Sequence, residues 1–110
     1  MKELIISGRT KIIPQEVMFC EADINYTRIH SINSMVIVPV SLKNVAKKLE
    51  EFSFIRIHRS YLINVKFMTD NYDRFEVEML NKRSLTISRR KESNFRKLLK
   101  QNKNSVNTFQ

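Results

Sequence analysis

The chain has 110 residues, of which 42% are apolar and 28% charged, so its length accommodates a single globular domain. Its one cysteine, Cys20, excludes a disulfide within the chain and favours a reducing compartment, and we expect a cytoplasmic protein. The sequence has no apolar run of about 18 residues and no basic-then-apolar leader, so we expect neither a membrane span nor export. We expect one domain over residues 1–103 and a polar, frayed tail over residues 104–110.

The formal net charge of +9 is concentrated in the last quarter of the chain. Residues 82–110 contain nine lysines and arginines and one acidic residue, Glu92, whereas residues 1–81 are nearly neutral. A positive field concentrated in this way favours a polyanionic partner, and the charge alone leaves open duplex DNA, RNA or an anionic lipid surface. The plainer interpretation is a basic tail that contributes only to solubility.

Alternation of apolar and polar residues predicts that strands predominate in the first forty residues. The only glycine, Gly8, is expected at the turn of a first hairpin, because glycine adopts turn conformations at low cost. Pro39 cannot donate a backbone hydrogen bond and is therefore expected at the edge of a sheet. The predicted strands cover residues 4–7, 11–13, 17–22, 26–32 and 35–40.

Two segments have the apolar spacing of a helix. Ser41 can cap the first turn of an amphipathic helix over about residues 41–52. A second helix is expected over about residues 91–101. Its apolar stripe would pack on the core through Phe95, Leu98 and Leu99.

The second half of the chain also contains strands. Because predicted strands outnumber predicted helices, we expect a mostly β fold with short helices. After Ile57 the strand pattern stops, and we expect Arg59 and Ser60 to lie near the start of a short helical turn. The remaining strands are predicted over residues 54–57, 65–69, 75–79 and 85–87.

No constellation of residues indicates catalysis. His30 and His58 are far apart in sequence, and no nucleophile elbow, phosphate-binding glycine loop or metal-ligand spacing accompanies them. Cys20 lies in an apolar run, where a cysteine is usually a small core residue. We therefore expect a protein that is not an enzyme and that binds no cofactor and no metal.

Three separate segments combine cations with side chains that can reach base edges, which is the mixture that nucleic-acid binding requires. At the second of them, exposed amide groups of a turn beside an arginine would attract a phosphate. Lys82 and Arg83 do not belong with Arg89, because a strand of about five residues, roughly 17 Å long, separates them. The three segments are residues 25–28, 56–64 and 88–91.

The order and spacing of several motifs resemble the LytTR-type DNA-binding domain of bacterial transcriptional regulators. The most specific motif is FIRIHRSYLIN over residues 54–64. The others are weaker singly, but they follow one another in the order that the family shows. They are VMFCEA over residues 17–22, NYTRIH over residues 25–30, SLK over residues 41–43 and SRR over residues 88–90.

The resemblance implies an elongated, mostly β fold of about ten short strands, whose loops enter successive major grooves of duplex DNA in place of a recognition helix. It also implies two copies on spaced repeats of a short motif, with at most a weak homodimer on DNA. Many family members carry a receiver domain, but the 16 residues before Val17 do not resemble one, and the sequence identifies no input signal. The family often has Asn-Gly at the turn that here reads Asn81-Lys82.

By the same resemblance, Thr27, Arg59 and Arg89 are the residues expected to contact bases. Arginine suits bidentate hydrogen bonding to O6 and N7 of guanine, and the threonine offers a methyl group for thymine and a hydroxyl for a polar edge. The residues expected to hold phosphates are Asn25, Arg28, Ser60, Lys66, Arg90 and Lys91.

Two other functions stay open from the residues alone. A small basic β-rich domain could be a general RNA-binding or ribosome-associated module, although such modules usually expose aromatic platforms and this chain has no tryptophan. The basic helix over residues 91–100 could instead dock an acidic protein or an anionic membrane. Its apolar positions, however, form a narrow stripe that fits packing on its own domain.

Overall fold

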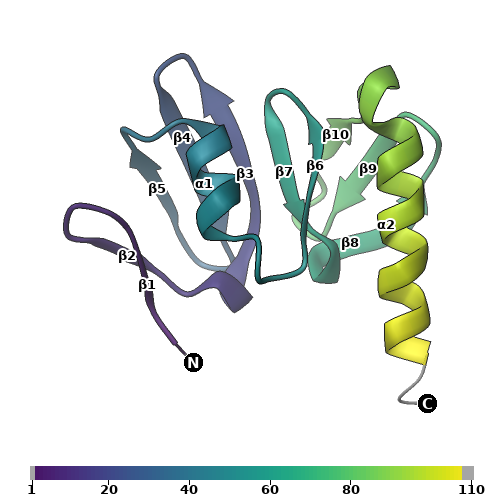
Figure 1. Cartoon of the computed structure of the whole chain (residues 1–110), viewed down its shortest axis with the longest axis horizontal. Coiled ribbons are helices and arrows are strands. Elements are labelled where there is room, and N and C mark those ends of the chain that lie inside the picture. The colour runs from purple at the N-terminus through teal and green to yellow at the C-terminus, as the bar shows by residue number, and fades with distance from the viewer. Residues whose placement is uncertain (1, 108–110) are drawn as a thin grey trace.

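The computed structural model describes the backbone of residues 2–107 and the side chains of residues 2–101. Its described elements confirm the predicted class of fold, mostly β with two α-helices (Figure 1). In chain order they are β1 (Leu4–Ser7), β2 (Thr10–Ile12), β3 (Val17–Asp23), β4 (Tyr26–Ser31), β5 (Met35–Val38), α1 (Leu42–Lys48), β6 (Phe54–His58), β7 (Tyr61–Asn64), β8 (Met68–Tyr72), β9 (Glu76–Met79), β10 (Ser84–Thr86) and α2 (Arg89–Asn107). Single 3₁₀ turns cover Pro14–Glu16 and Val65–Phe67.

A five-stranded antiparallel sheet forms the centre of the domain, in the order β5-β4-β3-β7-β6. β5 lies at its edge, as the position of Pro39 predicted. The chain also forms a β1–β2 hairpin around Gly8 and a three-stranded sheet in the order β10-β9-β8. The domain measures 37 × 31 × 24 Å and is therefore moderately elongated.

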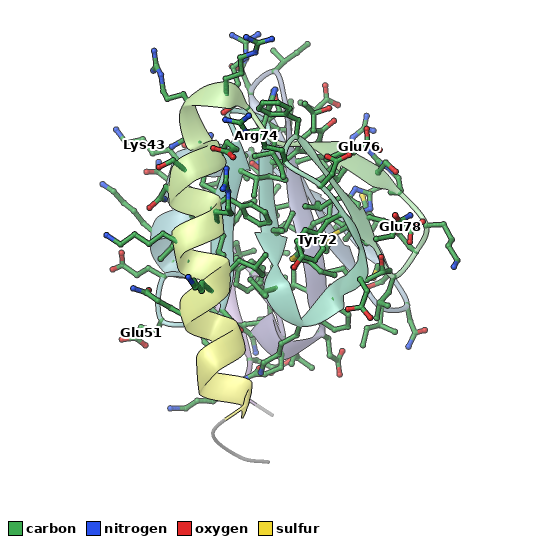
Figure 2. The ribbon with its side chains drawn as sticks, turned by 90° about the vertical axis from the view of Figure 1, so that its right-hand side faces the viewer. Lys43, Glu51, Tyr72, Arg74, Glu76 and Glu78 are labelled. Atoms are coloured by element: carbon green, nitrogen blue, oxygen red, sulfur yellow. The ribbon has the colours of Figure 1, made fainter. Side chains whose placement is uncertain are left out.

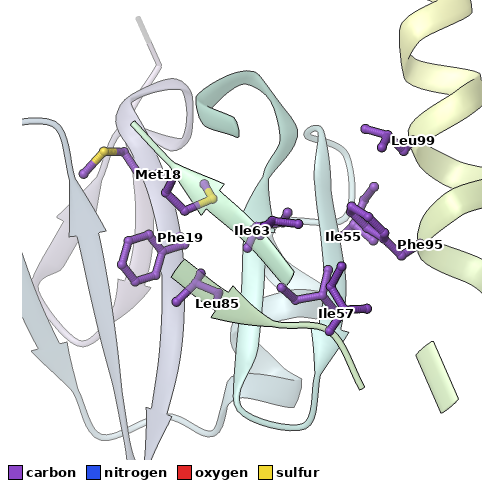
Figure 3. Close-up of a cluster of buried hydrophobic side chains, with 11 residues drawn as sticks. Met18, Phe19, Ile55, Ile57, Ile63, Leu85, Phe95 and Leu99 are labelled. Atoms are coloured by element: carbon purple, nitrogen blue, oxygen red, sulfur yellow. The ribbon is translucent and has the colours of Figure 1, made fainter. Parts of the chain in front are cut away.

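The central sheet is covered on both faces, and each face has its own apolar core. On one face, α1 and the β1–β2 hairpin cover a cluster that includes Cys20, Ile29 and Leu62. Burial raises the pKa of the Cys20 thiol to about 12, which fits the predicted core role. On the other face, α2 and the three-stranded sheet cover a second cluster. Figure 3 labels eight of its members: Met18, Phe19, Ile55, Ile57, Ile63, Leu85, Phe95 and Leu99.

The segment after Ile57 is a hairpin, so the helical turn expected there is wrong. β6 and β7 pair up to His58 and Tyr61, which leaves Arg59 and Ser60 as the two loop residues. β7 is buried from both sides, because Leu62 belongs to one core and Ile63 to the other. A strand covered on both faces is apolar without alternation, and this is why its sequence did not show the period of a strand. The family sequence motif therefore lies on a strand, a tight turn and a second strand.

Both helices differ in length from their predicted spans. The amide of Asn44 donates to Ser41 Oγ at 3.2 Å, as expected of the cap, but α1 ends at Lys48 and the chain then turns toward β6. α2 begins at Arg89 and continues to Asn107, beyond the boundary expected at residue 103. Residues 108–110 of the predicted tail lie outside the described residues.

An ion-pair network attaches the β9–β10 turn to the central sheet. Arg83 donates from its two terminal nitrogens to the two carboxylate oxygens of Glu21, each at 3.1 Å. His30 Nε2 lies 2.7 Å from Glu21 Oε1. Burial opposes ionisation of Glu21, but the hydrogen bonds from Arg83 and His30 and the positive charge of Arg83 outweigh it and lower the carboxyl pKa. This turn includes Lys82 with φ of 74°, a conformation that favours glycine, which the family often has there.

We predict that Glu21→Gln lowers the free energy of unfolding at pH 6 by about 1–2 kcal/mol, because the amide can keep neutral hydrogen bonds, worth about 1 kcal/mol each, but loses the charge that raises such a bond to roughly 1.5–3 kcal/mol. The pKa of Glu21 is lowered in the folded state. The stabilisation is therefore fully present above the unfolded carboxyl pKa, about 4.3, and is lost as the pH falls through the lower folded value. Urea unfolding of both proteins at a series of pH values should show the two free energies converging in acid.

The exposed residue Glu76 provides a matched control, and Glu76→Gln should change the stability little at any pH. If the difference between the wild type and Glu21→Gln stays constant down to low pH, ionised Glu21 does not stabilise the network.

Candidate nucleic-acid interface

Three segments that are far apart in sequence lie along one edge of the molecule. They are the β3–β4 turn (Ile24–Asn25), the β6–β7 turn (Arg59–Ser60) and the start of α2 with the preceding residue (Ser88–Lys91). In Figure 1 they occupy the upper edge, while the C-terminal end of α2 points downward. We call these residues the turn edge.

Two backbone hydrogen bonds hold the three parts of the turn edge side by side. The amide of Ser88 donates to the carbonyl of Ile57 at 2.8 Å, so the start of α2 is fixed next to the end of β6. The amide of Ala22 donates to the carbonyl of Ser60 at 2.9 Å, so the end of β3 is fixed next to the β6–β7 turn. Backbone contacts therefore fix the relative positions of the turns.

The β6–β7 turn is braced from within. Arg56 Nε donates to the carbonyl of His58 at 2.9 Å, and a terminal nitrogen of Arg56 donates to the carbonyl of Arg59 at 2.6 Å. The amide of Ser60 donates to His58 Nδ1 at 3.0 Å. Partial burial lowers the pKa of the Arg56 guanidinium. These contacts occupy Arg56 and His58 and leave Arg59 exposed at the tip.

The sequence did not identify Arg56 as a residue that positions the turn. Strand alternation only indicates which face of β6 a side chain occupies. The bonds that Arg56 makes run to carbonyls two and three residues further on, and they exist only because the chain reverses at Arg59 and Ser60. Because a helical turn was predicted at this point, the hydrogen bonds from Arg56 to the hairpin carbonyls were not expected.

The start of α2 presents consecutive cations. Arg89 and Arg90 are exposed, and Lys91 is half-buried. Ser88 Oγ accepts a hydrogen bond from the amide of Lys91 at 3.2 Å and caps the helix. The Arg89 guanidinium lies 5.9 Å from the centroid of the Phe75 ring, a distance at which a cation is attracted to an aromatic face. The positive end of the helix dipole adds to the attraction for an anion.

The acidic residue in the first turn of α2 does not compensate these cations, because it already has partners. Glu92 accepts hydrogen bonds from Arg96, one turn further along the helix, and from Arg74 Nε at 3.0 Å. The hydrogen bond from Arg96 and that from Arg74 lower the pKa of the Glu92 carboxyl. Figure 2 shows Arg74 beside α2. Glu92 therefore does not pair with the arginines of the turn edge, and their positive charges are available to an anion.

Thr27 does not belong to the turn edge. Its side chain is fully buried, and its hydroxyl donates to the carbonyl of Val40 at 2.6 Å. It faces the same side of β4 as buried Ile29, two residues away, and strand alternation in the sequence already contained this signal. In this structure Thr27 stabilises the chain after β5 and has no surface to offer to a base.

Lys66 is also separated from the other predicted contacts. It lies in the 3₁₀ turn Val65–Phe67, which follows the end of β7 that is remote from the β6–β7 turn. A four-residue strand is about 13 Å long, so Lys66 is at the opposite end of the sheet from Arg59. The sequence motif alone did not show that β7 separates the two residues.

The β3–β4 turn carries two further predicted contacts. Asn25 is exposed in the loop itself. Arg28 follows on β4, and its terminal nitrogen donates to Asp23 Oδ2 at 2.7 Å, with both side chains more than two-fifths exposed. Exposed ion pairs contribute little to stability, so Arg28 can exchange this partner for a phosphate at low cost.

The part of the chain that the structure describes lacks the features of two other kinds of site. No group of three or more His, Cys, Asp or Glu side chains there could hold a metal ion. No helix there combines the length and the apolar character needed to cross a membrane.

Comparisons with known proteins agree with this geometry. The family model of the LytTr DNA-binding domain matches residues 7–100. A stretch of 47 residues is 34% identical to the CO-responsive transcriptional regulator RcoM of Rhodospirillum rubrum, which corresponds to 43% of this chain and 20% of that protein. The matched segment thus spans about a fifth of that relative's length. A solved LytTr DNA-binding domain from Bacillus cereus has the same fold, with a TM-score of 0.73, 24% identity, and coverage of 90% of this chain and 97% of that one.

The fold and the family match together define a DNA-binding domain of the kind found in transcriptional regulators. The chain belongs to the LytTR family, as its motifs predicted. This family is characterised by DNA binding and not by catalysis, which is consistent with the expectation that the chain is not an enzyme.

We predict that Arg90→Ala weakens binding to duplex DNA and reduces the slope of log affinity against log salt concentration by about 0.9, because we expect Arg90 to contact one phosphate. Lys66→Ala removes another exposed cation, at the opposite end of the sheet, and should change neither quantity. Fluorescence anisotropy titrations at several salt concentrations measure both. An equal loss in Lys66→Ala would place phosphate contacts outside the turn edge.

Proposed function

We propose that this chain binds duplex DNA sequence-specifically as part of a bacterial transcriptional regulator, and that the turn edge enters the major groove. The observation that carries the proposal is the hydrogen bond between Ser88 and Ile57, because it brings together two exposed arginines, Arg59 and Arg89, from segments thirty residues apart. Arg59 lies in a hairpin turn and Arg89 is the first residue of α2, so this mode of binding needs no helix that lies along its length in the groove.

The dimensions of DNA favour this mode of binding. The major groove is about 12 Å wide and admits a two-stranded ribbon, whereas the minor groove is about half as wide. The β6–β7 hairpin ends in a loop of only two residues, so its tip is as narrow as a hairpin can be. Its tip would carry Arg59 to the floor of the groove, where guanine presents O6 and N7 as acceptors.

Four other residues of the turn edge would hold the DNA backbone. Arg90 and Lys91 provide charge, and Asn25 and Ser60 provide neutral donors. Arg28 would join them by exchanging Asp23 for a phosphate. We leave Thr27 and Lys66 out of the proposed contacts, because one is buried and the other lies at the far end of the sheet.

One copy presents a short turn edge, and a single copy would read only a few base pairs. We therefore propose that two copies occupy repeats of a short motif spaced along the duplex, with a weak homodimer formed on DNA. Motifs on the same face of the duplex would be about 10 base pairs apart, or a multiple of that distance.

We predict that Arg59→Ala weakens binding to the preferred sequence by about 1–3 kcal/mol, the usual worth of a bidentate contact to a base, and weakens binding to random duplex much less. Lys91→Ala should weaken both to a similar extent, because a phosphate contact carries no sequence information. The preferred sequence is obtained by selecting bound duplexes from a random pool, and affinities are then measured in the same salt.

Structured RNA serves as the competitor in these titrations. If RNA displaces the selected duplex as well as unlabelled duplex does, the general RNA-binding alternative replaces our proposal. If Arg59→Ala and Lys91→Ala reduce specific and random binding alike, the division into base contacts and phosphate contacts is wrong.

A further inference from the structure

Ile24, at the tip of the β3–β4 turn, combines two unfavourable features. Its side chain is 93% exposed, more than any other large apolar residue described. Its backbone φ is 55°, in the left-handed region. For a β-branched residue this conformation is an outlier, because the branched side chain crowds the backbone, and such strain costs about 1–3 kcal/mol.

The chain itself shows how such a turn is normally built. In the β1–β2 turn, the residue with φ of 53° is Gly8, which has no side chain to crowd. At the first position of a two-residue hairpin loop, a positive φ is usually supplied by glycine or asparagine. Here Asn25 occupies the second position and Ile24 the strained first one. Stability of the hairpin therefore does not account for isoleucine at position 24.

Exposure alone would not require an explanation, since single apolar residues are common on protein surfaces. Ile32 and Ile37 are 52% and 53% exposed, and neither has a positive φ. Ile24 differs from them in its backbone conformation and in its position on the turn edge. The hydrogen bond from Ala22 to Ser60 fixes the base of its hairpin beside Arg59.

We propose that Ile24 reads sequence by packing its side chain against the 5-methyl group of a thymine in the major groove. This inference rests on the proposed function and assigns to Ile24 the thymine contact that the sequence suggested for Thr27. The thymine methyl is the apolar group that the base pairs display on the floor of the major groove. Between polar neighbours such as Asp23 and Asn25, an exposed isoleucine supplies the matching apolar surface.

Replacement of thymine by uracil tests the contact, because it removes the 5-methyl group and leaves the pairing edge unchanged. The probes are duplexes selected from a random pool with wild-type protein, with each thymine replaced singly. For the wild type, uracil at one position of the motif should lower affinity by about four-fold, the worth of one buried methyl group. Ile24→Asn should bind the thymine duplex about four-fold more weakly and show no response to uracil at that position.

Two further variants complete the experiment. Ile24→Gly removes the strain and the side chain together, and should behave like Ile24→Asn toward uracil while melting at the same or a higher temperature than the wild type. Ile32→Asn replaces an exposed isoleucine at the other end of β4 and should keep the wild-type response to uracil.

The outcomes separate this inference from the function on which it rests. The role of Ile24 is refuted if the wild type selects a motif but no uracil replacement lowers its affinity. It is also refuted if uracil lowers the affinity of Ile24→Asn and Ile24→Gly as much as that of the wild type. In both cases sequence-specific binding stands. If no motif is selected from the pool, the proposed function fails, and this inference fails with it.

Discussion

The turn edge depends on backbone hydrogen bonds between segments that are distant in sequence. The bond from Ser88 to Ile57 fixes α2 against β6, and the bond from Ala22 to Ser60 fixes β3 against the β6–β7 turn. Because the donors and acceptors are peptide groups, these positions do not vary with side-chain rotamers. A surface fixed before binding loses little conformational entropy when it binds, and so more of its contact energy appears as affinity.

The rigidity of this edge comes from the core beneath it. β7 lies between β3 and β6, and its two central residues, Leu62 and Ile63, enter the apolar clusters on opposite faces of the sheet. β3 and β7, which each form one side of these two turns, are thus among the most buried strands that the structure describes. Functional loops are usually held by such a scaffold. A strained residue such as Ile24 persists only where its surroundings fix its conformation in this way.

The sequence predicted what depends on local pattern. Hairpin turns, the edge position near Pro39 and the cap at Ser41 follow from the properties of single residues, and the family motifs identified the arginines of the turn edge. What it missed depends on tertiary context. β7 has no alternation because both its faces are buried. Lys66 was named as a phosphate contact by family resemblance, which did not show that β7 places it at the opposite end of the sheet from Arg59. The burial of Thr27 could have been predicted from its spacing to Ile29.

The most direct test of the account is methylation interference on the selected duplex with wild-type protein and with the Arg59→Ala and Arg89→Ala variants. A methyl group on guanine N7 blocks an acceptor in the major groove, whereas one on adenine N3 lies in the minor groove. We predict interference at guanine N7 with the wild type, lost at one guanine with the first variant and at a different guanine with the second. Interference only at adenine N3, or a guanine pattern that neither variant changes, would contradict this prediction.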